Sequence, residues 1–252
     1  MMKVSLMGTG NVAHHLYQTL SAAMEVEIVQ VFGRKQDVLG NEHEYSPFDG
    51  AIKEADIFIL AVSDDSISAV AQKFSSVKGL LVHTSGSVAI DSLPKKVRRG
   101  AFYPLQTFSK ERKVDLRKTP ICIEAETPKD LELLNLLASL ISDNVHTVSS
   151  EKRAYLHLSA VFVNNFVNHL YQIGETIATD HNLPFTLLHP LISETAKKMD
   201  TLSPKDAQTG PSKRGDLSAM KKHLSLLKDH KEYSEIYRLM SQSISTLYEK
   251  KL

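Results

Sequence analysis

The sequence predicts the α/β fold class, with a doubly wound parallel sheet followed by an all-α C-terminal domain. In the first half of the chain, short apolar runs alternate with helical patterns. These runs lack the polar–apolar alternation of half-exposed strands, which favours a parallel sheet covered by helices on both faces. After residue 150, no convincing strand pattern remains. We therefore expect two domains, residues 1–150 and residues 151–252.

The first domain is predicted to alternate strands with helices. The run at 25–32 contains the β-branched pair Ile28 and Val29, and the run at 56–62 is almost entirely apolar, so both are expected to be strands. The predicted strands cover 3–7, 25–32, 56–62, 79–83, 120–125 and 145–148. The predicted helices cover 11–23, 48–54, 66–74 and 128–142.

The second domain is predicted to consist of helices. One long helix is expected over 151–181, and Asn182-Leu183-Pro184 ends it, because proline suits the first turn of a following helix. Between the helices, the Ser-, Pro-, Lys- and Gly-rich segment 201–215 is expected to be an ordered loop or a mobile lid. Further helices are predicted over 187–199, 216–227 and 232–250. A domain of roughly a hundred residues has a small core by itself, so a homodimer through the helical domain is expected.

The composition excludes several functional classes. With 30 basic and 29 acidic side chains, the formal net charge of +1 gives no general attraction to nucleic acid or to an anionic membrane. The single cysteine, Cys122, lies in an apolar run and is expected to be a buried thiol. The 11 histidines form no compact metal-ligand pattern, so no metal site is predicted. Because the start lacks a signal-peptide layout and no apolar run reaches the ~20 residues of a membrane helix, a cytoplasmic location is expected.

The N-terminal strand, turn and helix carry a dinucleotide-binding motif. Gly8-Thr9-Gly10-Asn11-Val12-Ala13 follows a strand and opens a helix, as in Rossmann domains. In this G-x-G-x-x-A pattern, Gly8 permits a tight turn, Gly10 lets a pyrophosphate approach the backbone, and Ala13 allows close helix–strand contact. The phosphates would bind the unpaired amides at the helix start. The alternative is an ordinary tight turn.

The end of the second strand indicates which dinucleotide binds. An NAD-selective domain places an acidic side chain there to hold the ribose 2′-hydroxyl. This sequence instead has Gly33-Arg34-Lys35. A guanidinium group fits a 2′-phosphate, which a carboxylate would repel. NADP is therefore the predicted cofactor, and a solvated basic turn is the alternative.

Polar residues follow two of the central strands. Ala61-Val62-Ser63 ends one strand, and Thr84-Ser85 follows another. Because ligands bind at the carboxyl ends of parallel strands, these residues are predicted to contact the ribose or the nicotinamide. Each serine or threonine could instead cap a helix or stabilise a turn.

Several segments together resemble a known family. The sequence is similar to predicted NADP oxidoreductases of the 6-phosphogluconate dehydrogenase-like superfamily, in which a Rossmann-like domain precedes a helical domain of unknown function. That superfamily includes hydroxyisobutyrate dehydrogenases, ketopantoate reductases and pyrroline-carboxylate reductases. The resemblance implies NADP binding, a dimerising helical domain, and ketopantoate reduction as one candidate chemistry. The segments that carry it are Gly8–Ala13, Val82–Ser87, Gly100–Phe108, Val163–His169 and Gln208–Asp216.

One catalytic residue of the resembled superfamily is missing. Its hydroxyacid dehydrogenases have a K-x-x-N-N motif, whose lysine acts as the proton donor. Aligning that motif with Asn164-Asn165 places Val161 at the lysine position. Because valine cannot donate a proton, the acid must be sought elsewhere.

Carbonyl reduction needs a proton donor and polar groups near the developing alkoxide. On the long predicted helix, a histidine and three asparagines are spaced by three or four residues, which places them on one face. Because unpaired asparagines are expensive to bury, this stripe indicates a polar cleft, although bonds to neighbouring backbone are an alternative. The candidate catalytic residues are His157, Asn164, Asn165, Asn168, Tyr103 and His83.

Two polar segments are candidates for substrate binding. Gln106 and Thr107 lie in a polar turn between apolar residues and could bond a polar substrate group. Gln208, Thr209 and Arg214 lie among turn residues, where Arg214 could clamp a substrate carboxylate. An ordinary surface ion pair is the alternative for Arg214.

Together these observations predict an NADP-dependent oxidoreductase that reduces a small, acidic carbonyl or imine substrate. The missing lysine supports an alternative from another class, an NADP-binding sensor or partner-binding protein without redox turnover. A deazaflavin-linked NADP reductase is a third hypothesis, which would need a second pocket for a flat ring. The substrate, the direction of reaction and the proton donor stay open at this stage.

Overall fold

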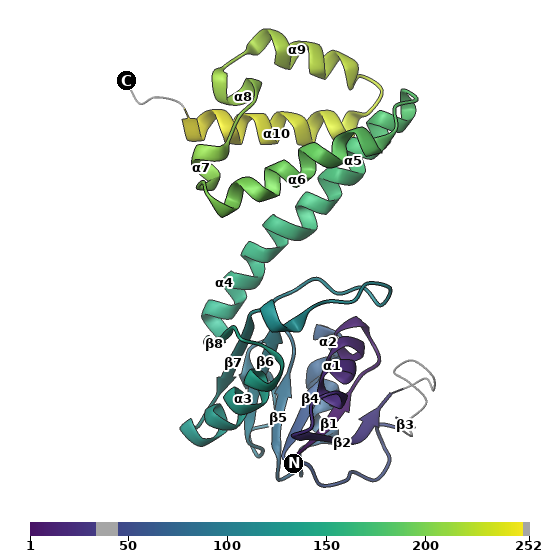
Figure 1. Cartoon of the computed structure of the whole chain (residues 1–252), viewed down its shortest axis with the longest axis vertical. Helices are drawn as coiled ribbons and strands as arrows, with labels where there is room; N and C mark the ends of the chain where they lie inside the picture. Colours follow the sequence, from purple (N-terminus) through teal and green to yellow (C-terminus); the bar gives the residue numbers. More distant parts are fainter. Residues whose placement is uncertain (34–44, 249–252) are drawn as a thin grey trace. The chain divides into compact units, whose positions relative to one another are not determined.

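The computed structural model describes residues 1–33 and 45–248. The chain divides into two compact units, Met1–Phe166 and Val167–Leu252. The first unit contains a sheet with helices on both faces, and the second consists of helices (Figure 1). The predicted fold class is confirmed: a Rossmann-like, doubly wound sheet precedes a helical region.

Eight strands form the sheet among the described residues of the first unit, in the order β3-β2-β1-β4-β5-β6-β7-β8. All neighbouring strands are parallel except β6 and β7, which are antiparallel. The switch in strand order lies between β1 and β4, so the crevice that binds ligands in such sheets is expected at the carboxyl ends of these strands. The strands are β1 (Met2–Met7), β2 (Val26–Phe32), β3 (Tyr45–Ser46), β4 (Ile57–Leu60), β5 (Leu80–His83), β6 (Arg99–Pro104), β7 (Ile121–Ala125) and β8 (Val145–Thr147).

Helices pack on both faces of this sheet. Helices α1 (Asn11–Ser21) and α3 (Pro128–Ile141) share one apolar core with the sheet, and α2 (Asp64–Lys73) contributes to the other. On β4, Ile57 and Ile59 belong to the first core, whereas Phe58 and Leu60 belong to the second. Because successive strand side chains point to opposite faces, two covered faces require an unbroken apolar run, as the sequence has.

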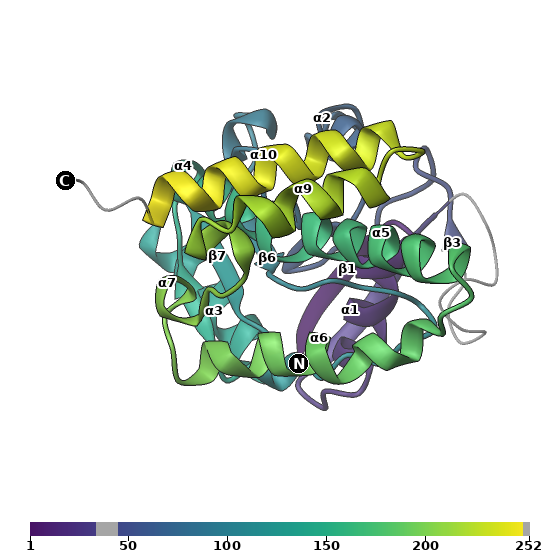
Figure 2. The ribbon, with the colours of Figure 1, turned by 90° about the horizontal axis from the view of Figure 1, so that it is seen from above.

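The second unit begins at Val167, within the long helix that starts with α4 (Ser150–Ala160). Helices α9 and α10 run alongside each other, and His223 Nδ1 and the Tyr237 hydroxyl form a 2.8 Å hydrogen bond between them (Figure 2). In the part of the chain that the structure describes, no helix has the length and apolarity needed to cross a membrane. The helices of this unit are α5 (Val167–Asp180), α6 (His189–Lys197), α7 (Pro204–Ala207), α8 (Pro211–Arg214), α9 (Leu217–Leu226) and α10 (Lys231–Tyr248).

Short 3₁₀ turns occur in both units. They cover Ile90–Ser92, Leu116–Lys118, Phe185–Leu188 and Lys198–Asp200.

The helix predicted over 48–54 is absent from the structure. Gly50 N–H donates to the Pro47 carbonyl in a turn, and the segment then runs as irregular backbone to β4. The Gln30 side chain from β2 donates to the Ala51 carbonyl at 2.8 Å and accepts from Lys53 N–H at 2.9 Å. Gln30 therefore satisfies backbone groups that a helix would have paired internally.

Strand β6 was not predicted, because Arg99, Gly100 and Pro104 are poor strand formers. The sheet tolerates them for identifiable reasons. The buried Arg99 guanidinium donates to the Glu126 carboxylate at 2.7 Å, and Pro104 is the last residue of the strand. Polar partners and position at the strand end therefore override the local propensity.

The long predicted helix contains a π-helical turn. Between α4 and α5, residues Val161–Phe166 are π-helical. A π turn pairs residues i and i+5, so it interrupts the α-helical spacing that predicted a common face for His157 and the asparagines. Segment 201–215, predicted as a loop, contains the short helices α7 and α8.

The predicted domain boundary at residue 150 coincides with the end of the sheet, because β8 ends at Thr147 and α4 begins at Ser150. The compact units divide later, after Phe166. The physical reason lies in α4, which is fastened to the sheet by an ion pair between the buried Arg153 and Glu124 of β7.

Candidate active site

A pocket of about 620 Å³ lies where β1, β2, β4 and β5 end. It is formed by the turn after β1, the start of α1 and the residues that follow the three neighbouring strands. Segments far apart in the sequence are thus brought together as the motif predicts. The predicted cofactor residues in its wall are Gly8, Thr9, Gly10, Asn11, Val12, Gly33, Ala61, Val62, Ser63 and Thr84, and Phe48, Ser66 and Val70 complete it.

The turn after β1 accepts only glycine at its first position. Gly8 has a φ of +120°, and a Cβ there would lie 2.1 Å from the Ala61 carbonyl oxygen. A Cβ on Gly10 would meet none of the described residues within 4 Å, and the backbone at Gly10 borders the pocket. This cradle fits a group that approaches the main chain closely, as a pyrophosphate does.

The start of α1 is free to bind an anion. Gly10 is its N-cap, no side chain of the described residues caps the helix, and its first turn contains no acidic residue. The unpaired amides and the positive end of the helix dipole both favour a phosphate group. The Asn11 side chain donates instead to the Phe108 carbonyl at 2.8 Å, which ties the loop after β6 to this helix.

The predicted polar residues of the pocket have different local roles. Ser63 and Thr84 lie in the pocket wall. The Ser85 hydroxyl is outside this wall and accepts from Ser87 and Val88 N–H, both at 3.1 Å, so Ser85 stabilises the turn after β5, and the cofactor role predicted for it stays a prediction. Arg34 and Lys35, predicted to select the 2′-phosphate, lie outside the described residues.

Two predicted proton donors form a hydrogen-bonded pair. The Tyr103 hydroxyl at the end of β6 lies 3.0 Å from His157 Nδ1 on α4, and the rings meet edge to face. Tyr103 is buried and His157 is partly exposed. Burial raises the pKa of Tyr103 to about 12, so its hydroxyl keeps its proton near neutral pH.

The turn after β5 fits closely against this pair. A Cβ on Gly86 would lie 2.7 Å from Tyr103 Cζ and 2.7 Å from His157 Nδ1. Any side chain at this position would therefore separate the two rings or displace the turn. The Ser87 hydroxyl in the same turn donates to the Asp64 carboxylate at 2.5 Å, which fastens the turn to α2.

Sequence reasoning missed Arg153, which is completely buried beside the pair. Its guanidinium donates to the Ser85 carbonyl at 3.2 Å and to the Val88 carbonyl at 2.6 Å, and it forms an ion pair with Glu124. Arg153 thereby holds the turn after β5 against α4. The available signal was its spacing of four residues from His157, which places both on one face of the helix.

His83 lies at the end of β5 and is fully buried. Its Nδ1 accepts from Ser85 N–H at 3.2 Å, and its Nε2 has no hydrogen-bond partner among the described residues. Burial, assisted by the charge of Arg153, lowers the pKa of His83 to about 4. The neutral imidazole of His83 supports the turn after β5 and has no access to solvent.

The predicted asparagines and the polar turn after β6 lie at the surface. Asn164 and Asn165 belong to the π turn and Asn168 to α5, and all three side chains are exposed. Gln106 and Thr107 are also exposed, and Gln106 Oε1 accepts from Thr107 N–H at 2.8 Å. The predicted pairing of these amides with a substrate stays a prediction.

Three further candidates for substrate binding lie in the second unit. The Gln208 side chain donates to the Thr209 carbonyl at 2.8 Å, and Thr209 lines an apolar pocket of about 360 Å³ within that unit. Arg214 is the last residue of α8 and is exposed, without an ion pair to any described residue.

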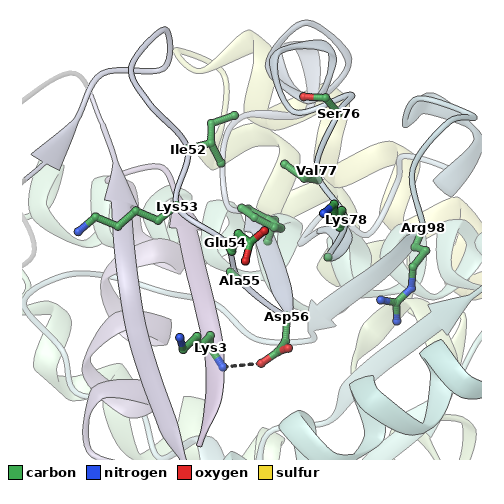
Figure 3. A pocket seen from close by; sticks show the side chains of 12 residues that line it. Lys3, Ile52, Lys53, Glu54, Ala55, Asp56, Ser76, Val77, Lys78 and Arg98 are labelled. Atoms are coloured by element: carbon green, nitrogen blue, oxygen red, sulfur yellow. Dashed lines mark hydrogen bonds between the residues drawn. The ribbon is translucent and has the colours of Figure 1, made fainter.

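A second hollow of about 430 Å³ lies at the opposite edge of the sheet, where β1, β4 and β5 begin (Figure 3). Its cationic side chains, Lys3, Lys53, Lys78 and Arg98, stand beside Glu54 and Asp56. Asp56 accepts from Lys3 N–H at 2.8 Å (Figure 3), and Arg98 is paired with Asp130. Because it lies at the amino ends of the strands, it is a poorer candidate than the pocket above α1.

Comparison with known proteins assigns the chain to a family. Residues 119–244 match the family described as "Domain of unknown function (DUF2520)". The chain also shares 36% identity with a protein of known structure from Bacteroides fragilis, described as a "putative NADP oxidoreductase", over 97% of this chain and 98% of that one, with a TM-score of 0.90. The chain belongs to the DUF2520 family. No curated protein sequence matches it.

More distant solved structures share the fold of this DUF2520 protein. A pyrroline carboxylate reductase from Plasmodium falciparum with NADP bound is 15% identical, with a TM-score of 0.57 over 97% of this chain and 98% of that one. An imine reductase from Myxococcus stipitatus in complex with NADP⁺ is 15% identical, with a TM-score of 0.61 over 98% of this chain and 92% of that one. At such identities the likeness concerns the fold alone.

The family match and the pocket are independent observations. The matched segment begins at residue 119, whereas the glycine turn that forms the cradle lies at residues 8–13. Of the Tyr103–His157 pair, only His157 lies inside the matched segment. The site of this DUF2520 protein is therefore argued from its geometry.

Proposed function

We propose that this chain is an NADP-dependent oxidoreductase that reduces a small carbonyl or imine substrate. The observation that carries the proposal is the position of the Tyr103–His157 pair close to the pocket at the start of α1. Thr84 lines that pocket, and Gly86, two residues later, touches both rings. Two residues span at most about 7 Å. A phosphate cradle and a pair able to donate a proton therefore share one edge of the sheet.

The residues of the pocket fit the cofactor. The backbone at Gly8–Gly10 and the free start of α1 would hold the pyrophosphate, and Ser63 and Thr84 would bond the nicotinamide ribose. Arg34 and Lys35 would bind the 2′-phosphate. When bound, NADPH supplies the hydride that reduces the substrate carbon.

The substrate proposed is a small, acidic carbonyl compound, for which a ketopantoate-like oxoacid is one candidate, or an imine. The acidic substrate is motivated by the sequence context of Arg214, whose guanidinium group suits a carboxylate. The imine option is supported by the shared fold of the imine and pyrroline carboxylate reductases.

An NADP-binding sensor without redox turnover is the second candidate. The observation that favours it is Val161, which stands in the π turn where related dehydrogenases have a lysine donor. The two functions differ in one measurable property. A reductase oxidises NADPH when a suitable oxoacid or imine is added, whereas a sensor binds the nucleotide inertly.

The first test is a fluorescence titration of the protein with NADPH and with NADH. We expect tighter binding of NADPH, and loss of that preference in Arg34→Ala but not in the matched control Arg112→Ala, an exposed arginine of the same unit. A panel of small oxoacids and imines then tests turnover. Absence of binding for both nucleotides would overturn the proposal.

We also propose that the protein is a homodimer joined through its helical unit. Among the described residues of Val167–Leu252, only three apolar side chains are buried, namely Ile173, Ala178 and Leu227. A unit with so small a core needs a further surface to cover its exposed leucines, and a second copy provides one.

A further inference from the structure

We infer that Tyr103 and His157 act together as a proton relay, in which Tyr103 is the catalytic donor and His157 replenishes its proton. The inference rests on the proposed reductase function and names the group that replaces the missing lysine. It starts from the contact between the two side chains, which are 54 residues apart in the sequence and 3.0 Å apart in the structure.

Neither residue alone is a good donor. Loss of the proton from Tyr103 would leave a phenolate among side chains that exclude water, because Tyr103 is only 9% exposed. His157 is partly exposed and can exchange protons with solvent, but its Nδ1 is directed at the tyrosine oxygen. In the pair, the histidine supplies the exchangeable proton and the tyrosine presents it.

The step balances in atoms and charge. As the substrate carbon gains a hydride, its C=O or C=N double bond becomes a single bond and the oxygen or nitrogen takes the Tyr103 hydroxyl proton. The O–H bond of Tyr103 breaks and re-forms with the proton from Nδ1 of the His157 imidazolium. His157 is left neutral and regains a proton from water through its partly exposed ring.

The surrounding groups leave His157 as the proton-exchanging member of the cluster. Asp64 of α2, Arg153 of α4 and Cys122 of β7 face Tyr103, and His83 of β5 lies beside Arg153. Burial lowers the pKa of His83 to about 4 and raises the pKa of the Cys122 thiol, and Tyr103 has a pKa of about 12. Because His83 is fully buried and His157 is partly exposed, His157 is the imidazole of this cluster that can exchange protons with solvent.

Gly86 is a positioning residue for the relay. A Cβ at residue 86 would lie 2.7 Å from both rings. The φ of Gly86 lies outside the range that only glycine favours, so glycine is needed here because a larger residue would not fit. Gly86→Ala is expected to lengthen the Tyr103–His157 contact and to slow turnover without changing NADPH affinity.

The experiment compares Tyr103→Phe and His157→Gln with matched controls. Tyr155→Phe removes an exposed tyrosine hydroxyl from the same helix as His157, and His146→Gln removes an exposed histidine of the same unit. We measure NADPH affinity, the rate of NADPH oxidation with the best substrate of the panel, its pH profile, and the His157 Nδ1 signal in ¹⁵N NMR spectra. Thermal melting confirms that each variant is folded.

The expected result is a 10²–10⁴-fold lower rate in both relay variants, with NADPH affinity within about twofold of wild type. The pH profile of the rate should change in His157→Gln, and Tyr103→Phe should move the Nδ1 signal while Tyr155→Phe leaves it in place. Turnover that survives Tyr103→Phe, or an Nδ1 signal that does not move, overturns the relay alone. Failure of the wild type to bind NADPH overturns the proposed function instead, and binding without turnover of any panel member overturns both the relay and the reductase.

Discussion

At the scale of single residues, the two glycines after β1 are needed for different physical reasons. Gly8→Ala would place a methyl group 2.1 Å from the Ala61 carbonyl at a φ of +120°, so we expect it to lower stability by about 1–3 kcal/mol and to impair NADPH binding. Gly10→Ala meets no atom of the described residues within 4 Å. It should keep the melting temperature and weaken NADPH binding at least tenfold, because the methyl group occupies the space above the cradle. Thermal melting and fluorescence titration check both, and wild-type affinity in Gly10→Ala would contradict the placement of the pyrophosphate.

His83 makes stability depend on pH. Because burial lowers its folded pKa from 6.5 to about 4, the unfolded chain binds an extra proton between these values. Stability should therefore fall as the pH drops from 6.5 toward 4, with about 2 kcal/mol lost by pH 5. Urea unfolding at pH 7 and pH 5 should show this loss in the wild type and much less of it in His83→Asn. The matched variant His146→Asn, at an exposed histidine, should keep the wild-type dependence, and an equal loss in all three proteins would exclude His83 as the cause.

Single residues were predictable from the sequence where a local motif defines them. The glycine turn and the polar residues after β4 lie around the pocket because the motif itself specifies strand, turn and helix start. Tyr103 and His157 were each candidates, but their contact depends on the unpredicted strand β6 and on how α4 packs. Arg153 was missed because a basic residue beside Glu151 and Lys152 in a first helical turn resembles an exposed one.

At the scale of elements, the wrong predictions were a helix over 48–54 and the omission of strand β6. Both occur where a side chain of a distant residue stabilises an unusual local sequence. Gln30 holds the segment that was predicted as a helix, and Glu126 neutralises the arginine inside β6. Such partners are distant in sequence, so a local pattern cannot reveal them. Strands β1, β4 and β5 were predictable because a strand that is buried on both faces needs a continuous apolar run.

Helix α4 should depend on Arg153 for its place on the sheet. Arg153→Met removes the ion pair with Glu124 and two bonds to the turn after β5, and leaves the carboxylate with its hydrogen bonds from Ser150 but without its cation. Breaking a buried pair in this way costs about 3–5 kcal/mol, which urea unfolding should detect. Adding Glu124→Gln should restore part of the loss. The control Arg117→Met, at an exposed pair with Asp143, should change stability little, and an equally small effect of Arg153→Met would contradict the anchoring role.

At the scale of the whole molecule, the two units differ in how completely they bury their apolar side chains. The sheet unit has two extensive cores, whereas the helical unit exposes several large leucines, among them Leu191 of α6 and Leu239 of α10. If a second copy covers this surface, light scattering at micromolar concentration should give the mass of a dimer. Leu191→Asp and Leu239→Asp, tested separately, place a charge on the surface, and at least one should shift the mass toward the monomer. Leu136→Asp, at an exposed leucine of α3 in the sheet unit, should remain dimeric. A monomeric wild type would refute the dimer, and a dimer that survives both helical-unit substitutions would place the interface elsewhere.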